Sequence, residues 1–231
     1  MQARDVMTTN VITVSPETTV QEVAQCLLER SISAVPVVDA GGKLLGIVSE
    51  GDLMRRNETG TERKHSWWLD MVSSTQDQAR EYVKTHGTHA RDVMTRSLVT
   101  VAEDASLEDV ASLLEKHHIK RVPVVKDGRV VGIVSRANLL RGLIAKQQQP
   151  STPTRDDRAL RTAVTKAIEE TGARSHLVSV MVSAGKVQLW GAVDSKEEKD
   201  AIRVAAENTP GVQAVEENLR VFSGASRPSW A

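Results

Sequence analysis

Hydrophobic and polar residues follow the same order in two separate parts of the chain. In the first part, an apolar run at residues 11–14 precedes apolar positions with helical spacing. A Val-Pro-Val-Val strand at 35–38, a turn, and a Gly-Ile-Val strand from Gly46 follow, and another helix then begins. This pattern predicts the order strand, helix, strand, strand, helix, which is a mixed α/β (α+β) arrangement containing a β-hairpin.

The second part repeats the first almost block for block. The segment ARDVMT begins at Ala3 and again at Ala90, and the two Val-Pro-Val-Val strands are also 87 residues apart. Between Gly46 and Gly132 the offset is 86 residues, so the second hairpin turn is one residue shorter. Repeated units bury their apolar faces against neighbouring copies, and clefts between related halves are natural ligand sites. We therefore expect a module with pseudo-two-fold symmetry.

Helix starts are marked at equivalent places in both repeats. Thr19 precedes Glu22, and Ser106 precedes Asp109, at the spacing of a capping box. Apolar residues then recur with helical spacing, which predicts one amphipathic helix in each repeat. A further helix is predicted to begin directly after each Gly-Ile-Val-Ser strand.

A polar insert at residues 56–89 separates the repeats. It contains Trp67 and Trp68 and a short predicted helix at 76–84. Adjacent tryptophans point to different sides of a helix, so at least one is expected to pack on a neighbouring surface. We favour a structural flap over a partner-binding hot spot for this insert.

The character of the chain changes after residue 146. Residues 147–154 have the composition of a linker. Beyond it, the pattern predicts a helix at 158–168, a hairpin of two strands at 176–182 and 187–193, a helix at 195–208 and a strand at 212–221. This segment is a third, smaller α/β domain, and residues 224–231 are predicted to be a disordered tail.

Composition and charge narrow the class of protein. Thirty basic residues balance thirty acidic ones, which argues against a general nucleic-acid binder, because such a protein needs a basic surplus. Cys26 is the only cysteine, so no disulfide forms within the chain, and its apolar helical position favours a buried small residue over a reactive thiol. The N-terminus has no signal-peptide core, and no stretch approaches about 18 apolar residues. A soluble cytoplasmic protein is therefore expected.

Both repeats resemble the CBS motif, which is named for cystathionine β-synthase. The resemblance rests on the apolar strand before the first helix, the hydrophobic-Pro-Val-Val strand and the Gly-Ile-Val-Ser strand that enters a helix. Two CBS motifs in tandem form a CBS pair, or Bateman module. The resemblance implies a regulatory module that binds an adenine nucleotide and pairs with a second copy as a homodimer. The resemblance covers about residues 3–55 and 90–146, and the two motifs are assigned to residues 1–55 and 90–146.

Residues 155–223 resemble a BON domain, which is named for bacterial osmotic-shock and nodulation proteins. The matching segments are VQLWGAVDSKEEKDAI from Val187 and PGVQAVEENLRV from Pro210. The resemblance implies contact with phospholipid or with a partner protein. Ten basic and eleven acidic residues give residues 155–223 no net attraction to an anionic membrane, so protein association is favoured. For Trp190, core or hairpin packing is favoured over an exposed anchor.

The resemblance also implies a nucleotide site in the first motif. Ser49 and Asp52 match the positions that hold phosphate and ribose in CBS pairs. A carboxylate accepts hydrogen bonds from both hydroxyls of a ribose, and a helix N-terminus offers N–H groups to an anion. The same spacing also suits a simple helix cap, so both interpretations stay open.

The second motif departs from this pattern. Ser135 is kept, but Asn138 replaces the aspartate, and an amide lacks the charge and the two-oxygen grip of a carboxylate. Unequal sites are therefore expected, with the Asp52 site the better ribose binder. Lys120 and Arg121 match a basic pair that contacts phosphates in the nucleotide-sensing gamma subunit of AMP-activated protein kinase, although a solvated corner explains them too. Apolar and backbone groups around six residues are expected to hold the adenine: Ile12, Thr13, Ile32, Val99, Thr100 and Ile119.

The sequence does not separate AMP, ADP and ATP as ligands, and NAD or S-adenosylmethionine is less expected. No nucleophile–base pair, Walker loop or pair of catalytic carboxylates stands out, and the histidines lack metal-ligand spacing, so neither an enzyme nor a metal site is expected. Two hypotheses remain. The first is a nucleotide sensor that relays its state through the BON domain; the second is an adaptor that uses the BON domain for protein or membrane association.

Overall fold

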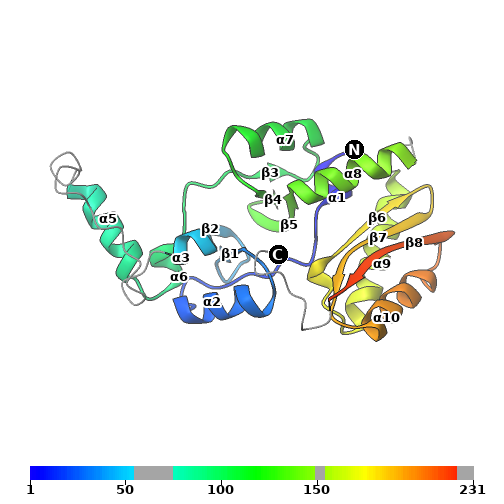
Figure 1. Ribbon diagram of the computed structural model, residues 1–231. Helices are drawn as coiled ribbons and strands as arrows, with labels where there is room; N and C mark the ends of the chain where they lie inside the picture. Colours follow the sequence, from blue (N-terminus) through cyan, green and yellow to red (C-terminus); the bar gives the residue numbers. More distant parts are fainter. Residues whose placement is uncertain (55–74, 149–153, 223–231) are drawn as a thin grey trace. The chain divides into compact units, whose positions relative to one another are not determined.

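The structure is a computed structural model that describes residues 1–54, 75–148 and 154–222. These residues form two compact units, which we call the first and the second unit. The first unit comprises the described residues of Ile12–Leu98, and the second comprises Met1–Val11 together with the described residues from Val99 to Phe222. Figure 1 shows the elements of both units. The predictions for Trp67, Trp68 and the C-terminal tail fall outside the described residues.

The first unit is built around a two-stranded antiparallel hairpin. Its buried core consists of aliphatic side chains from the hairpin and the surrounding helices, together with Met94. The elements are α2 (Val20–Glu29), β1 (Ala34–Val38), β2 (Leu44–Ser49), α3 (Glu50–Leu53), α5 (Thr75–His86) and α6 (Ala90–Val93).

The second repeat forms the same hairpin with one more strand. Strand β3 pairs in parallel with β4, and β4 pairs antiparallel with β5. The turn between β4 and β5 has positive φ at Asp127 and Gly128, as expected for a two-residue hairpin loop. The elements of this part are α1 (Ala3–Val6), β3 (Val101–Ala102), α7 (Leu107–Lys116), β4 (Arg121–Lys126), β5 (Arg129–Ser135) and α8 (Arg136–Gln148).

The first residues of each repeat pack on the hairpin of the other repeat. Met7 lies so close to Gly132 that a Cβ on this glycine would overlap its sulfur, and Met94 lies against Gly46 in the same way. Main-chain bridges accompany these contacts, one of them between Thr8 and Ile133. Each unit is therefore assembled from both sequence repeats, and the first unit begins at Ile12 and not at the start of the first repeat.

The strand predicted at residues 11–14 is reduced to a single parallel bridge between Val14 and Val37. The Val14 N–H donates to Pro36 O, and the Val38 N–H donates to Val14 O. Proline has no N–H, so the next bond of the parallel ladder has no donor and the pairing ends there. In the second repeat, Val101 is the counterpart of Val14 and pairs with Val124 in the same way. Here the parallel ladder continues one residue toward the C-terminus, to Ala102, and gives the short strand β3.

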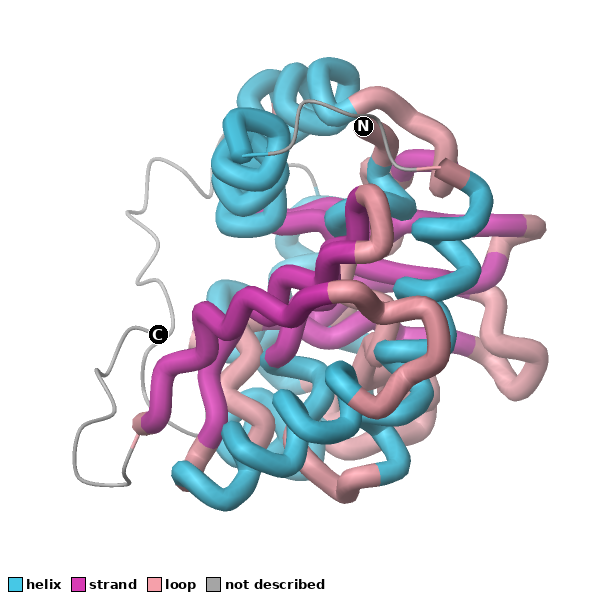
Figure 2. Tube along the Cα trace, turned by 90° about the vertical axis from the view of Figure 1, so that its right-hand side faces the viewer, coloured by secondary structure: helices cyan, strands magenta, loops and turns pink. Residues whose placement is uncertain are grey.

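The C-terminal domain has the predicted order of helix, two strands, helix and strand. Strands β6 and β7 form an antiparallel hairpin, and β8 pairs with β7 in parallel. The two long helices pack on one face of this sheet, which lies in front in Figure 2. The predicted mixed α/β fold is thus confirmed. The elements are α9 (Arg155–Glu170), a 3₁₀ turn (Ser175–Leu177), β6 (Val178–Ser183), β7 (Lys186–Val193), α10 (Lys196–Glu207) and β8 (Ala214–Val221).

The structure differs from the sequence-based predictions at the linker and at Cys26, and agrees with them at Trp190. Helix α8 runs to Gln148, so the first two residues of the predicted linker are helical. Cys26 is half-buried and not fully buried, and burial raises the pKa of its thiol, which keeps it protonated at neutral pH. Trp190 packs against the apolar core of the second repeat, as the packing interpretation predicted.

Asp157 connects the start of α9 to the β6–β7 turn. Its carboxylate accepts hydrogen bonds from the Thr154 N–H at 2.9 Å, the Thr154 hydroxyl at 2.9 Å and the Gly185 N–H at 3.0 Å. Burial alone would raise the pKa of this carboxyl, but the hydrogen bonds from Thr154, Gly185 and the Ala184 backbone outweigh it and lower the pKa. The ionised carboxylate therefore stabilises the folded domain.

Replacement of Asp157 by asparagine is expected to lower the free energy of unfolding by about 1–3 kcal/mol at pH 7, because an amide places N–H donors opposite N–H donors. Since the folded pKa is lowered, the stabilisation is complete above the ordinary value of 3.8 and is lost as the pH falls through the folded pKa. Urea denaturation between pH 7 and pH 2.5 measures both effects. Asp156→Asn, at an exposed neighbour, is the control and should change neither.

Candidate functional site

The predicted site in the first repeat lies where β2 ends and α3 begins. The Ser49 N–H donates to Asp52 Oδ2 at 2.9 Å, and the Ser49 hydroxyl donates to the same oxygen at 2.6 Å. These bonds are the ones expected of a helix cap, so the capping interpretation describes one oxygen of this carboxylate.

The other oxygen of Asp52 meets groups from outside the motif. Thr95 Oγ1 donates to Asp52 Oδ1 at 3.3 Å, and Lys84 Nζ lies 3.5 Å from it. The Asp52 side chain is 15% exposed, and that of Lys84 is 47% exposed. Asp52 Oδ1 thus has two long hydrogen bonds to exposed groups, whereas Oδ2 has two shorter ones within the cap.

Thr95 and Lys84 were not predicted as site residues. Thr95 ends the second ARDVMT segment, and its main chain pairs with Ile47 of β2, which places its hydroxyl beside Asp52. The repeat itself was the available signal, because Thr95 is the counterpart of Thr8. Lys84 lies on α5 in the insert, which has no counterpart elsewhere in the chain, so no repeat pattern could identify it.

The chemistry around Asp52 suits a ligand with hydroxyl groups and an anionic group. A carboxylate accepts from hydroxyls in charge-assisted bonds, and a lysine ammonium attracts phosphate as a point charge. Of the predicted adenine-contacting residues in this unit, Ile12 and Ile32 pack against the hydrophobic core, and Thr13 is exposed.

The equivalent position in the second repeat has the same cap but different surroundings. The Ser135 N–H and hydroxyl donate to Asn138 Oδ1 at 2.9 and 2.6 Å. The amide nitrogen donates to Val6 O at 2.8 Å and to the hydroxyl of Ser179, on strand β6, at 3.3 Å. Asn138 is only 3% exposed. Both polar atoms of this side chain are therefore engaged within the protein.

The remaining predicted residues of the second repeat surround Ser135. Arg121 is paired with Ser135 across the β4–β5 ladder, so a guanidinium and a hydroxyl lie on neighbouring strand ends. Lys120 is exposed, and its carbonyl oxygen accepts from the Arg136 N–H. Val99 and Ile119 pack against the apolar core of this repeat, and Thr100 is half-buried.

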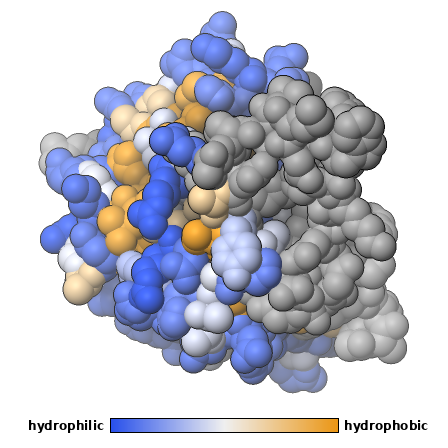
Figure 3. Space-filling view, turned by 90° about the vertical axis from the view of Figure 1, so that its left-hand side faces the viewer, coloured by the Kyte–Doolittle hydropathy of each residue, from blue (hydrophilic) through white to orange (hydrophobic). Residues whose placement is uncertain are grey.

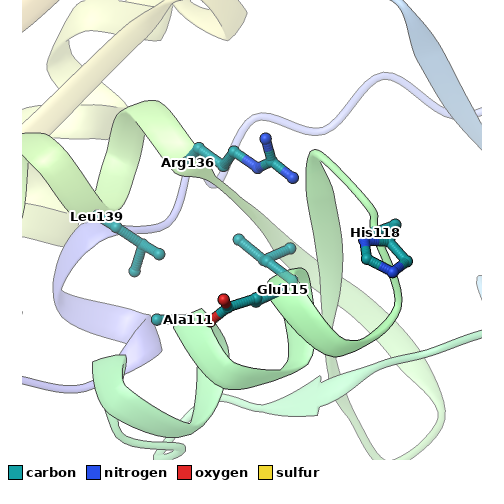
Figure 4. A pocket seen from close by; sticks show the side chains of 6 residues that line it. Ala111, Glu115, His118, Arg136 and Leu139 are labelled. Carbon is teal, nitrogen blue, oxygen red and sulfur yellow. The ribbon is translucent and has the colours of Figure 1, made fainter.

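A pocket of about 290 Å³ lies between α7 and α8 in the second repeat. Figure 4 shows the Arg136 guanidinium and the Glu115 carboxylate on its rim and Leu139 on its wall. The predicted site residues do not line it, although their chain neighbours His118 and Arg136 do. The lining residues are Ala111, Leu114, Glu115, His118, Arg136 and Leu139.

Comparison with known families agrees with this architecture. The CBS domain family matches residues 3–58 and 90–145, and the BON domain family matches residues 156–221. The CBS domain-containing protein YhcV of Bacillus subtilis is 33% identical over 136 residues, which are 59% of this chain and 81% of YhcV. This chain belongs to the CBS domain-containing proteins. Its two repeats are CBS motifs 1 and 2 of a CBS pair, and its C-terminal domain is a BON domain.

Two plant relatives add to the comparison. The chloroplastic CBS domain-containing protein CBSX1 of Arabidopsis thaliana is 36% identical over 137 residues, which are 57% of this chain and 58% of CBSX1. The matched region thus covers only about three fifths of that relative. A crystal structure of CBSX2 in complex with AMP has 32% sequence identity and a TM-score of 0.54, and the match covers 62% of this chain and 96% of that one.

Residues 1–54, 75–148 and 154–222 contain no helix that is long and apolar enough to cross a membrane. The same residues contain no group of three or more histidine, cysteine, aspartate or glutamate side chains arranged to hold a metal ion.

Proposed function

We propose that this chain is a cytoplasmic, non-enzymatic regulatory protein whose CBS pair senses an adenine nucleotide, with Asp52 as the ribose ligand. The observation that carries the proposal is the Asp52 carboxylate, which has Thr95 and Lys84 beside one oxygen and a helix cap on the other. The likeness to a CBS-pair structure that contains AMP supports the choice of ligand.

The existing contacts of Asp52 Oδ1 can be exchanged for contacts with a ribose. A carboxylate has about four acceptor positions, and the two on Oδ1 are occupied by long bonds at 3.3 and 3.5 Å. Ribose hydroxyls can replace these bonds while Oδ2 keeps the cap with Ser49. Lys84 then lies next to a bound nucleotide, where its charge suits a phosphate. Ile12, Thr13 and Ile32 complete the adenine environment of motif 1 in this proposal.

Motif 2 contributes positive charge in the same proposal. Arg121 and Ser135 at neighbouring strand ends, with Lys120 next to them, form the phosphate-contacting group. Val99, Thr100 and Ile119 are the apolar and backbone counterparts of the adenine residues in motif 1. The preferred ligand class is AMP, ADP or ATP, with NAD and S-adenosylmethionine as weaker candidates.

The sensor acts by a shift between two states, which requires the nucleotide to prefer one of them. We propose that the BON domain passes this shift to a protein partner, in preference to phospholipid. Homodimer formation through the CBS motifs is supported by exposed apolar side chains on α2 and α8. Figure 3 shows apolar residues among hydrophilic ones on one face of the molecule. Leu28 on α2 is 75% exposed, and Leu140 and Leu143 on α8 are 63% and 56% exposed.

Replacement of Asp52 by alanine is expected to weaken adenylate binding at least tenfold, because hydrogen bonds to a charged group contribute about 1.5–3 kcal/mol each. Isothermal titration calorimetry with AMP, ADP and ATP measures this loss. Asp52→Asn keeps an acceptor for the cap but loses the charge, so it separates ribose binding from capping. Glu50→Ala, an exposed acid on the same short helix, is the matched control and should bind like the wild type. Equal affinity in Asp52→Ala and wild type would refute the assignment.

The completed caps at Asp52 and Asn138 favour a second candidate function. In this alternative the chain is an adaptor with no physiological nucleotide, and the BON domain mediates protein or peripheral membrane association. Absence of binding heat with every adenylate for the wild-type chain would favour the adaptor over the sensor.

A further inference from the structure

The BON domain meets CBS motif 2 along strand β6. Val178, Val180 and Val182 point into the core of the BON domain, whereas Ser179 and Met181 lie on the opposite face of the strand. Met181 is 4% exposed and belongs to the apolar core of motif 2. Strand β6 therefore contributes side chains to the hydrophobic cores of both domains, one on each of its faces.

Polar contacts converge on Ser179, which is 2% exposed. Its hydroxyl oxygen accepts from Asn138 Nδ2 at 3.3 Å and from Arg141 Nη1 at 2.8 Å, both on α8. The Thr8 hydroxyl lies 3.4 Å away. A single serine of the BON domain thus contacts the start of α8 and the N-terminal segment at once.

Two arginines of α9 hold the N-terminal helix α1 against the BON domain. Arg158 Nε donates to Asp5 Oδ1 at 2.8 Å, and the Asp5 side chain is only 1% exposed. Arg161 is 8% exposed and donates to the carbonyl oxygens of Arg4, Met7 and Val180. The buried carboxylate is thereby paired, and main-chain acceptors from both domains are satisfied.

An asparagine at position 138 can make the contact with the BON domain that an aspartate, as at position 52, cannot make. In both motifs one side-chain oxygen accepts the two capping bonds from the preceding serine. The amide nitrogen of Asn138 then donates to Val6 O and to Ser179 Oγ. A carboxylate has no hydrogen to donate, and at this position its charge would face the Val6 carbonyl oxygen.

We propose that motif 2 is the docking site of the BON domain, with Asn138 as its anchor. In the docked state, a nucleoside is excluded from the position in motif 2 that corresponds to the Asp52 position in motif 1. The docking itself stands on the contacts described here, whereas the exclusion rests on the proposed function. The chain then binds one nucleotide at motif 1 while the BON domain is docked, and undocking opens the second position.

Hydroxyl-radical footprinting with mass spectrometry tests the docking on the full chain. Met181 is the reporter because it is buried at the interface, and Met54, which is 69% exposed, is the reference within each sample. In Asn138→Asp the cap is kept but the amide donor is lost, so Met181 is expected to oxidise at least fivefold faster than in the wild type. Asp52→Asn, the reciprocal change in motif 1, is the matched control and should leave Met181 protected.

Unchanged protection of Met181 in Asn138→Asp would overturn the docking assignment. If that variant loses its folded circular dichroism spectrum, Ser179→Ala decides the question, since it removes the acceptor from the BON side. Faster oxidation of Met181 in folded Ser179→Ala supports docking through this serine, and wild-type protection contradicts it.

Calorimetry with AMP on the same proteins tests the exclusion. One equivalent is expected for the wild type and two for Asn138→Asp. Two equivalents in the wild type with Met181 still protected would overturn the exclusion, and so would one equivalent in Asn138→Asp with Met181 exposed. No binding heat in any protein would instead refute the proposed nucleotide function, and the footprinting result would still report on docking.

Discussion

Gly191→Ala is expected to destabilise the BON domain by more than about 3 kcal/mol, a large part of the stability of a small domain. Gly191 has a φ of +148°, which L-residues rarely adopt. A Cβ at this position would overlap the Leu177 carbonyl oxygen and lie 3.1 Å from Val178 Cα. These are backbone atoms, and Val178 is the ladder partner of Gly191, so the neighbouring strand cannot move away without breaking the sheet.

Gly172→Ala is the matched control for this prediction. Gly172 also has a positive φ, of +76°, but an added Cβ would meet nothing within 4 Å. Only the backbone strain remains, which costs about 1–2 kcal/mol. Urea denaturation of both variants measures how much each substitution lowers the free energy of unfolding. A Gly191→Ala loss no larger than that of Gly172→Ala would show that the close approach of the backbone does not matter.

Arg161→Ala is expected to lower the free energy of unfolding by about 3–5 kcal/mol, because it leaves buried main-chain acceptors without a donor. The guanidinium bonds to Val180 O and Arg4 O are 2.6 Å long, and a third goes to Met7 O. Burial lowers the pKa of Arg161 to about 10, so the group stays charged at neutral pH. Its desolvation cost is offset by these bonds.

Two further variants separate charge from geometry at Arg161. Arg161→Lys keeps the charge, but a single ammonium cannot reproduce the planar fork of donors. We therefore expect its free energy of unfolding to lie between those of the wild type and Arg161→Ala. Arg203→Ala, on the exposed surface of α10, is the control and should change the unfolding midpoint little. A loss in Arg161→Ala as small as in Arg203→Ala would contradict the role of Arg161 as a buried crosslink.

Much of the local structure follows from short-range signals in the sequence. Thr19 with Glu22 and Ser106 with Asp109 do cap α2 and α7, and the hairpin turns lie where glycine and aspartate predicted them. These signals act between residues three or four positions apart, so they survive in any tertiary context. The strand predicted at residues 11–14 did not form, because Pro36 on the neighbouring strand lacks the N–H that its continuation requires.

The candidate site contains contacts between distant residues that short-range signals do not predict. The pair Ser49 and Asp52 could be identified from the repeat, but Thr95 and Lys84 lie 43 and 32 residues from Asp52. Asn138 was predicted to be the weaker ribose ligand because it lacks a charge. Its contacts to Val6 and Ser179, 132 and 41 residues away, give the same substitution a different interpretation as a docking residue.

Fold class, the order of elements, the helix caps and the two family memberships could therefore be predicted from residue patterns alone. The exchange of N-terminal segments between the repeats, the burial of Asn138 and the attachment of the BON domain to motif 2 emerged only in the folded chain. The physical reason is the range of the forces involved. Caps and turns depend on neighbours along the chain, whereas burial and the pairing of an amide or a guanidinium depend on which distant surface covers it.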